Sequence, residues 1–272
     1  MTPDQTALWQ RLEGFLGKIE ERLKEIIVEA ENGLGVLFAQ HPTDPMPIGN
    51  AMSGLDFRVK DLVKKIDETW SSQIEPKFEA AGDGRFLDKG LDRKRDFELH
   101  LEEQWDTFKV KAMSAYYRAM WPLVQAAMQK PVPCNRCGAE LVLPVRHESV
   151  SLPCSHCGSV NQVLVDTAVS YWFGGGAAHV FAEEAALPCR YAVERFRVQV
   201  DRDRRGRSWG QETIEQLREW DRLELAYWNR YAEVKAQVLG QPVDHELVKS
   251  RMDQFRKYSL ETNQVWRRAN PA

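Results

Sequence analysis

Four cysteines in the middle of the chain have the types and spacing of a metal site. Cys134 and Cys137 are separated by two residues, as are Cys154 and Cys157, and a glycine follows each pair. Two intervening residues let one tight turn direct both sulfurs inward, and glycine tolerates the positive φ that such a turn needs. Residues 138–153 are long enough for a short hairpin that brings the two turns together. Four thiolates suit a tetrahedral divalent ion, with metal–sulfur bonds of about 2.3 Å.

The other chemistries open to paired cysteines fit the sequence less well. A redox pair needs one Cys-x-x-Cys at a helix start beside a βαβ pattern, and this chain has no such pattern. Disulfides disagree with the odd count of five cysteines and with an N-terminus that lacks the features of a secretory signal. An iron–sulfur cluster could use four cysteines, but paired turns with trailing glycines favour zinc. Because four thiolates leave no open position, we expect the zinc to be structural rather than catalytic.

Residues typical of β-strands follow both cysteine turns, in the sequences AELVLPV (139–145) and VNQVLV (160–165). With them the module resembles the zinc ribbon family, in which two such turns, called knuckles, hold one zinc ion. The resemblance covers only about residues 132–165. It implies that the zinc ligands are Cys134, Cys137, Cys154 and Cys157.

Other residues with chemical potential are expected to be structural. His147 and His156 lie in the cysteine module, but four cysteines already complete the site, so we expect both at the surface. Cys189 stands alone after a proline, and we predict a buried, inert thiol. His179 and Glu183 are four residues apart and share a helix face, but they lack a third metal ligand.

An arginine-rich segment, residues 190–207, holds seven arginines against three acidic residues. Arginine is well suited to phosphate contacts. One interpretation is a solvated loop whose arginines form salt bridges to acidic helices. The alternative is a nucleic-acid-binding segment that uses Arg202, Arg204, Arg205 and Arg207.

The elements that must position these residues are predicted to be helices. Three stretches carry apolar residues at the three- and four-residue intervals of an amphipathic helix, which also suit a coiled-coil seam: 12–26, 101–127 and 217–238. The last of these is the clearest. Ser208 and Gln211 form a capping-box signature before it, and Gly240 is predicted to end it.

Proline and glycine predict where the N-terminal helices stop. The sequence ENGLG (31–35) supplies a stop signal for the first helix, and residues 41–54 are predicted to be a loop. A second helix is expected from about 55 to 78 and a third from about 91 to 130. Pro122 predicts a kink or break in the third helix.

The segments after the cysteine module are more ambiguous. Residues 167–182 have no charge but are too short and polar to span a membrane, so we predict helix, glycine turn and helix, with a membrane-interfacial segment as the alternative. Residues 189–200 fit a helix better than a strand. Residues 201–208 are predicted to be a charged loop, and a last helix is expected over about 244–267.

The sequence therefore predicts a mainly α fold, in which long amphipathic helices form hairpins or a bundle interrupted by a small β zinc ribbon. The expected regions are an N-terminal helical region (1–130), the ribbon (131–166) and a C-terminal helical region (167–272). The two helical regions could also pack as one domain.

The composition suits a soluble globular protein and argues against wholesale nucleic-acid coating, since the chain of 272 residues carries a net charge of −3. We expect a cytoplasmic, non-enzymatic interaction or scaffold protein that binds protein partners or self-associates. The first alternative is a nucleic-acid-associated protein that uses residues 190–207. The second is an enzyme of unknown class, which no catalytic motif supports.

Overall fold

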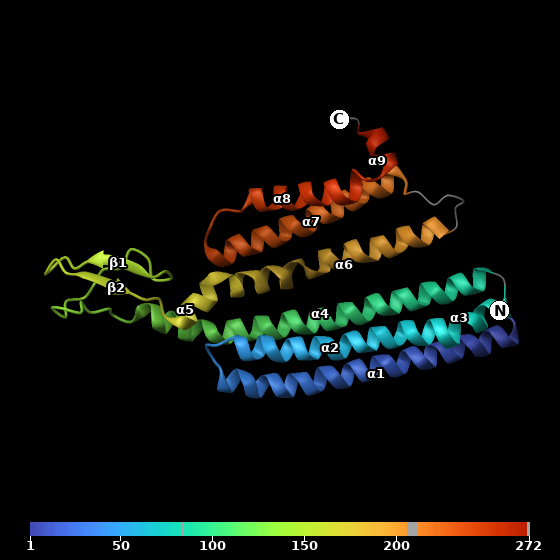
Figure 1. Cartoon of the computed structure of the whole chain (residues 1–272), viewed down its shortest axis with the longest axis horizontal. Helices are drawn as coiled ribbons and strands as arrows, with labels where there is room; N and C mark the ends of the chain where they lie inside the picture. The colour runs from blue at the N-terminus through green and yellow to red at the C-terminus, as the bar shows by residue number, and fades with distance from the viewer. Residues whose placement is uncertain (83, 206–211, 271–272) are drawn as a thin grey trace.

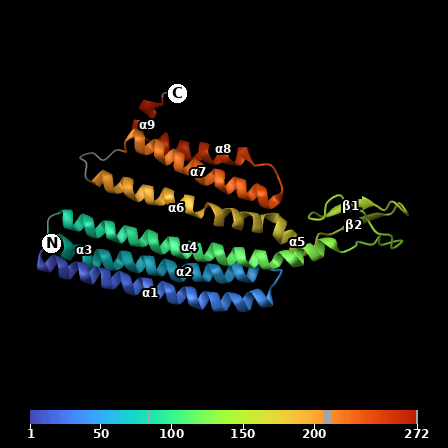
Figure 2. The same ribbon diagram turned by 180° about the vertical axis from the view of Figure 1, so that it is seen from behind.

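The computed structural model, which describes residues 1–82, 84–205 and 212–270, is an elongated stack of long helices with a small β module beyond one end (Figure 1). The view from behind shows the same order of helices across the stack (Figure 2). The mainly α prediction is confirmed. The principal helices are α1 (Pro3–Gln40), α2 (Met46–Thr69), α4 (Gly84–Gln129), α6 (Ala177–Arg205), α7 (Ile214–Leu239) and α8 (His245–Phe255).

The first helix is longer than predicted. It begins at a capping box, in which Thr2 and Gln5 satisfy each other's backbone N–H groups. The expected stop at ENGLG is wrong, because α1 continues through Gly33 and Gly35 to Gln40. Ala30 and Leu34 extend the buried stripe. Their burial outweighs a helix-propensity cost of about 1 kcal/mol for each glycine.

The predicted loop over 41–54 is also too long, because α2 already begins at Met46. Proline fits the first turn of a helix, where its missing N–H has no intrahelical partner, so Pro47 does not prevent the early start. Ile48 and Met52 are buried and hold this turn against the core. The helix continues through a π-helical turn, η1 (Trp70–Ile74), into α3 (Glu75–Ala81).

The long helix α4 is the central element of the stack (Figure 1). It begins at Gly84, earlier than predicted, and runs unbroken past Pro122 to Gln129. The predicted break at this proline therefore does not occur. Met120 and Val124 are buried on either side of Pro122 and keep both parts of the helix against the same core.

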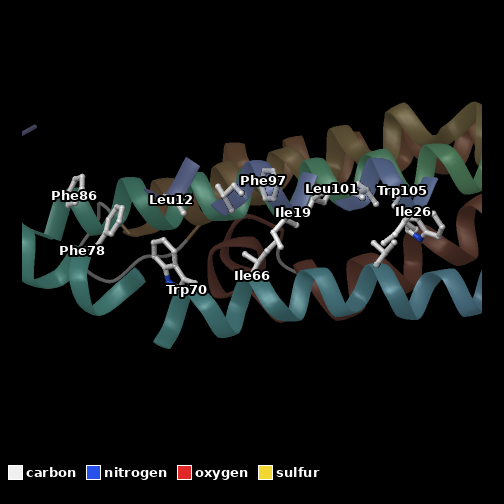
Figure 3. Close-up of a cluster of buried hydrophobic side chains, with 13 residues drawn as sticks. Leu12, Ile19, Ile26, Ile66, Trp70, Phe78, Phe86, Phe97, Leu101 and Trp105 are labelled. Carbon is white, nitrogen blue, oxygen red and sulfur yellow. The ribbon is translucent and has the colours of Figure 1, made fainter. Parts of the chain in front are cut away.

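The N-terminal core forms where α1, α2, α3 and α4 meet. The seam predicted over residues 12–26 is buried, and it faces Ile66 and Trp70 from one side and Phe97, Leu101 and Trp105 from another (Figure 3). Phe78 and Phe86 stack with ring centroids 4.5 Å apart where α3 turns back into α4. Burial of this apolar surface is the main source of stability for the N-terminal helices.

A second core joins the two helical regions. Tyr116, Met120 and Val124 of α4 pack with residues of α5 (Thr167–Tyr171) and of the π-helical turn η2 (Trp172–Gly176). The predicted glycine turn at 174–176 is therefore wrong, because η2 links α5 and α6 within helical structure. Gly176 is needed there because the ring and hydroxyl of Tyr117 occupy the space that a Cβ would take. No helix in the described part of the chain is both long and apolar enough to cross a membrane.

Helices α6 and α7 pack closely because small residues line their contact. Ala182 and Ala186 are fully buried against Tyr227 and Tyr231 of α7. The helix predicted for 189–200 is confirmed. The charged loop predicted for 201–208 is wrong over residues 201–205, which belong to α6, and its last three residues lie outside the described ones.

The start of α7 differs from the prediction and its end agrees with it. Ser208 and Gln211 lie outside the described residues, and the helix begins after Thr213, which forms a capping box with Gln216. Gly240 ends α7 in the left-handed conformation, with φ of 63°. The predicted last helix is divided into α8, the π-helical turn η3 (Arg256–Leu260) and α9 (Gln264–Ala269).

We predict that Gly90→Ala destabilises the protein by about 1–3 kcal/mol, although alanine favours helix, because overpacking strains a filled core. A Cβ at Gly90 would lie 2.7 Å from Phe78 and 2.9 Å from Trp70. Gly14→Ala is the control. No atom outside its own helix lies within 4 Å of that Cβ position, so the control should stabilise α1 by about 0.5–1 kcal/mol. Urea unfolding measures both, and equal effects would contradict the packing at Gly90.

Candidate metal centre

The cysteine module has a first knuckle followed by a two-stranded antiparallel sheet, and the second knuckle connects the two strands of this sheet. Strand β1 (Val150–Pro153) leads into Cys154, and β2 (Val160–Val163) follows the second knuckle. The strand predicted for 139–145 is wrong, since that segment forms only an isolated bridge at Glu140. Pro144 lacks the N–H that a longer ladder would need.

Both knuckles have the same backbone turn. The N–H of Gly138 donates to the Cys134 carbonyl at 3.0 Å, and the N–H of Gly158 donates to the Cys154 carbonyl at 2.9 Å. The glycine φ angles are 74° and 72°, in the left-handed region that side chains disfavour. The role predicted for these glycines is therefore confirmed.

The four cysteine sulfurs converge on one point. All four Sγ atoms lie within 4.8 Å of one another. Cys134 and Cys157 are 3.7 Å apart, and Cys137 and Cys154 are 3.8 Å apart. A tetrahedron with metal–sulfur bonds of about 2.3 Å has edges of about 3.8 Å, so the sulfurs have the spacing of a single-ion site. All four are free cysteines rather than disulfides.

Hydrogen bonds prepare two of the cysteines as thiolates. The Ser159 hydroxyl lies 3.2 Å from Cys134 Sγ and 3.0 Å from Cys157 Sγ. Hydrogen bonding from Ser159 lowers the pKa of both thiols, to about 5 for Cys134, where the N–H groups of Cys137 and Arg136 also contribute. The N–H of Ala139 lowers the pKa of Cys137, but burial and the neighbouring sulfurs raise it to about 12. A bound cation would offset this repulsion between sulfurs.

Asn161 connects the two knuckles. Its side chain is buried, its Oδ1 accepts from the Asn135 N–H at 2.9 Å, and its Nδ2 donates to the Ser159 carbonyl at 2.9 Å. One amide thus ties the turn after Cys134 to the residue beside Cys157. Asn161 was not predicted as a site residue. The only indication in the sequence is that a polar residue occupies an inward-facing position of a short strand.

A second missed contact attaches the module to the helices. Arg146 donates from Nη1 to the carbonyls of Met128 at 2.6 Å and Lys130 at 2.9 Å, at the C-terminal end of α4. Cations stabilise helix C-termini because the last carbonyls lack intrahelical partners. Beside it, His147 stacks on Phe173 with ring centroids 5.0 Å apart. His147 is therefore half-buried rather than fully at the surface, whereas His156 is exposed as predicted.

The other candidate residues have structural partners. Cys189 is half-buried rather than buried as predicted, and it packs against the tyrosine and alanine cluster between α6 and α7. His179 Nδ1 lies 2.7 Å from the Tyr231 hydroxyl, and Glu183 accepts from the Tyr227 hydroxyl at 3.0 Å. Within the described ranges, the four cysteines are the one His/Cys/Asp/Glu group with the geometry of a metal site.

The arginines at the end of α6 form ion pairs. Arg202 contacts Asp96 at 2.5 Å and Asp92 at 3.2 Å, both on α4. Arg205 also pairs with Asp92, and Arg204 contacts Glu212 at 2.9 Å. Arg207 lies outside the described residues. Arg190, Arg195 and Arg197, earlier in the segment, also pair with carboxylates. The salt-bridge interpretation of residues 190–207 therefore has direct support at six of its seven arginines, and these six lie on a helix rather than in a loop.

Comparison of the chain with protein-family models, with curated proteins and with solved structures finds no match. The inferences below therefore rest on the geometry of this chain.

We predict that Cys154→Ser lowers the bound metal to a small fraction of the wild-type content and unfolds the ribbon, because it removes one of four clustered ligands. Cys189→Ser is the matched control and should retain metal and helical content, since its thiol lies outside the cluster. Elemental analysis with circular dichroism checks both variants. Metal loss from Cys189→Ser would show that the ligand set is wrong.

Asn161→Ala should weaken metal affinity about 10–100-fold while leaving all four cysteines in place, because residues that position ligands affect metal sites to this extent. The change removes the amide that links the knuckles. Competition with a chromogenic chelator measures the affinity. Gln162→Ala, at the exposed neighbouring position, is the control. Equal affinities in the two variants would argue against the proposed role of Asn161.

Proposed function

We propose that the protein is a non-enzymatic helical interaction or scaffold protein in which one structural zinc ion folds the ribbon. The observation that carries the zinc assignment is the pair of sulfur distances across the knuckles, 3.7 and 3.8 Å, which suit a single ion. Sulfurs this close leave no space between them for the several irons and sulfides of a cluster. Among the common divalent ions that have no redox chemistry, zinc is the one that thiolates favour.

The ribbon needs such an ion because its own core is small. Among the described residues of the ribbon, its apolar cluster has three buried members, Cys134, Leu141 and Cys154, with a few half-buried aliphatic residues around them. A metal bound by the folded state alone supplies stabilisation on the order of 10 kcal/mol in small zinc modules. When bound, zinc would neutralise clustered thiolates and fix both knuckles, and its four sulfur ligands would leave no position for a substrate.

The helical body supports a scaffold role more than a catalytic one. His179, Glu183 and Cys189 are engaged by the tyrosines and packing of the α6–α7 interface. The ribbon lies beyond one end of the helical stack (Figures 1 and 2), where a partner can approach it. We infer protein partners or self-association in the cytoplasm, the reducing compartment that the free cysteines suit.

Nucleic-acid binding through Arg202, Arg204, Arg205 and Arg207 is the less favoured alternative. Phosphate would have to compete with carboxylates that already hold Arg202 and Arg205 against α4. The acidic partners also cancel much of the local positive charge that attracts nucleic acid.

The zinc assignment predicts one zinc per chain after metal-replete expression. Native mass spectrometry and elemental analysis of the purified protein measure it. Iron in the site, or protein that folds its ribbon without metal, would contradict the assignment.

The scaffold assignment predicts that the wild type does not bind mixed DNA or RNA at physiological salt, and that partners from a pull-down survive nuclease treatment. Replacing the four arginines with glutamine should lower thermal stability, since ion pairs between α4 and α6 are lost. The alternative requires salt-sensitive wild-type binding that the quadruple variant loses, because each phosphate contact releases counterions. That result would overturn the scaffold assignment.

A further inference from the structure

The outer face of β2 is apolar and exposed. Val160 and Leu164 are 71% and 80% exposed, whereas Asn161 between them is only 2% exposed. Alternation places Val160 and Gln162 on one side of β2, and Leu164, one residue past the end of the strand, continues this side. The surrounding segment, residues 149–165, contains no Asp, Glu, Lys or Arg, although 28% of the residues in the chain are charged.

The backbone of β2 also has an open edge. The Cys154 N–H donates to the Ser159 carbonyl at 2.8 Å, which makes these residues a hydrogen-bonded pair. Hydrogen-bonded and non-hydrogen-bonded pairs alternate along an antiparallel ladder. The next hydrogen-bonded pairs are therefore Leu152 with Asn161 and Val150 with Val163. Val160 and Gln162 therefore direct their N–H and C=O groups away from β1. Among the described residues, neither these two nor Leu164 makes a backbone hydrogen bond outside the β1–β2 ladder.

The exposed sequence is complementary to itself. Two β2 strands can pair antiparallel with the Gln162 residues of both copies facing each other at the centre. Val160 of each copy then lies opposite Leu164 of the other copy. Aliphatic cross-strand pairs stabilise sheets, and a two-fold axis satisfies both copies with the same contacts. No Asp, Glu, Lys or Arg side chains meet across such an edge, because residues 149–165 contain none. Exposed edges without charge or proline are templates for pairing with another chain.

We propose that β2 is a self-association edge, on which a second copy of this chain docks to form a four-stranded sheet in the order β1–β2–β2–β1. The ribbon lies beyond the end of the helical stack, so the helices do not cover it (Figures 1 and 2). The inference rests on the proposed zinc-folded ribbon. The pairing involves about five residues of each copy, which suits a weak, transient interface.

The test is sedimentation velocity of the full-length, metal-loaded protein over about 1–200 µM, the range in which a micromolar dimer dissociates. The wild type should shift from monomer to dimer across this range. The double variant V160K/L164K should bind itself at least tenfold more weakly, because it places two lysines of each copy at the shared edge. V142K is the matched control, because Val142 is 85% exposed on the same ribbon but lies outside β2.

A photo-reactive amino acid at position 162 gives an independent measurement. In the dimer it should crosslink to residues 160–164 of a second copy, as identified by mass spectrometry. A zinc-loaded wild type that stays monomeric contradicts the dimer alone. A dimer unchanged in V160K/L164K, or crosslinks only to a different protein, also contradicts it. Protein that binds no metal contradicts both this inference and the proposed zinc centre.

Discussion

The spacing of the four cysteine sulfurs constrains every other part of the ribbon. Sulfurs from two turns must meet within 4.8 Å, so both turns need the left-handed glycines at 138 and 158. The amide of Asn161 then holds the turns together, and the Ser159 hydroxyl lies within hydrogen-bond distance of the sulfurs of Cys134 and Cys157. These polar contacts fix the geometry of a module whose apolar cluster has only three buried residues among those described. The proposed zinc ion would supply the further stabilisation.

The helices hold the ribbon in a defined position. Helix α4 runs the length of the stack, and its last carbonyls accept from Arg146 of the ribbon. Further along α4, Asp106 accepts from the buried Tyr191 hydroxyl at 2.7 Å and contacts Arg190 and Lys109. Burial and the hydrogen bond to Asp106 raise the pKa of Tyr191 well above its usual range. The polar contacts of α4 thus connect both helical regions and the ribbon.

Local patterns in the sequence predicted the parts of this structure that depend on local chemistry. The spacing of Cys134, Cys137, Cys154 and Cys157 identified the cluster, and the apolar intervals identified the helical seams. Glycine and proline were misleading where tertiary burial outweighed their local preferences, as at Gly33, Pro122 and the glycines of η2. Asn161 and Arg146 escaped prediction because their partners come from other segments. The pairing of Arg202 and Arg205 with Asp92 spans more than one hundred residues and leaves no pattern in the sequence.

The central claim is that one zinc ion is bound by four thiolates. Zinc K-edge X-ray absorption on the purified full-length protein tests it most directly, because the fine structure reports the type, number and distance of the ligands. The account predicts four sulfur neighbours at about 2.3 Å and no nitrogen or oxygen in the first coordination sphere. Fewer than four sulfurs with a nitrogen or oxygen neighbour, or a site that holds iron in place of zinc, would contradict it.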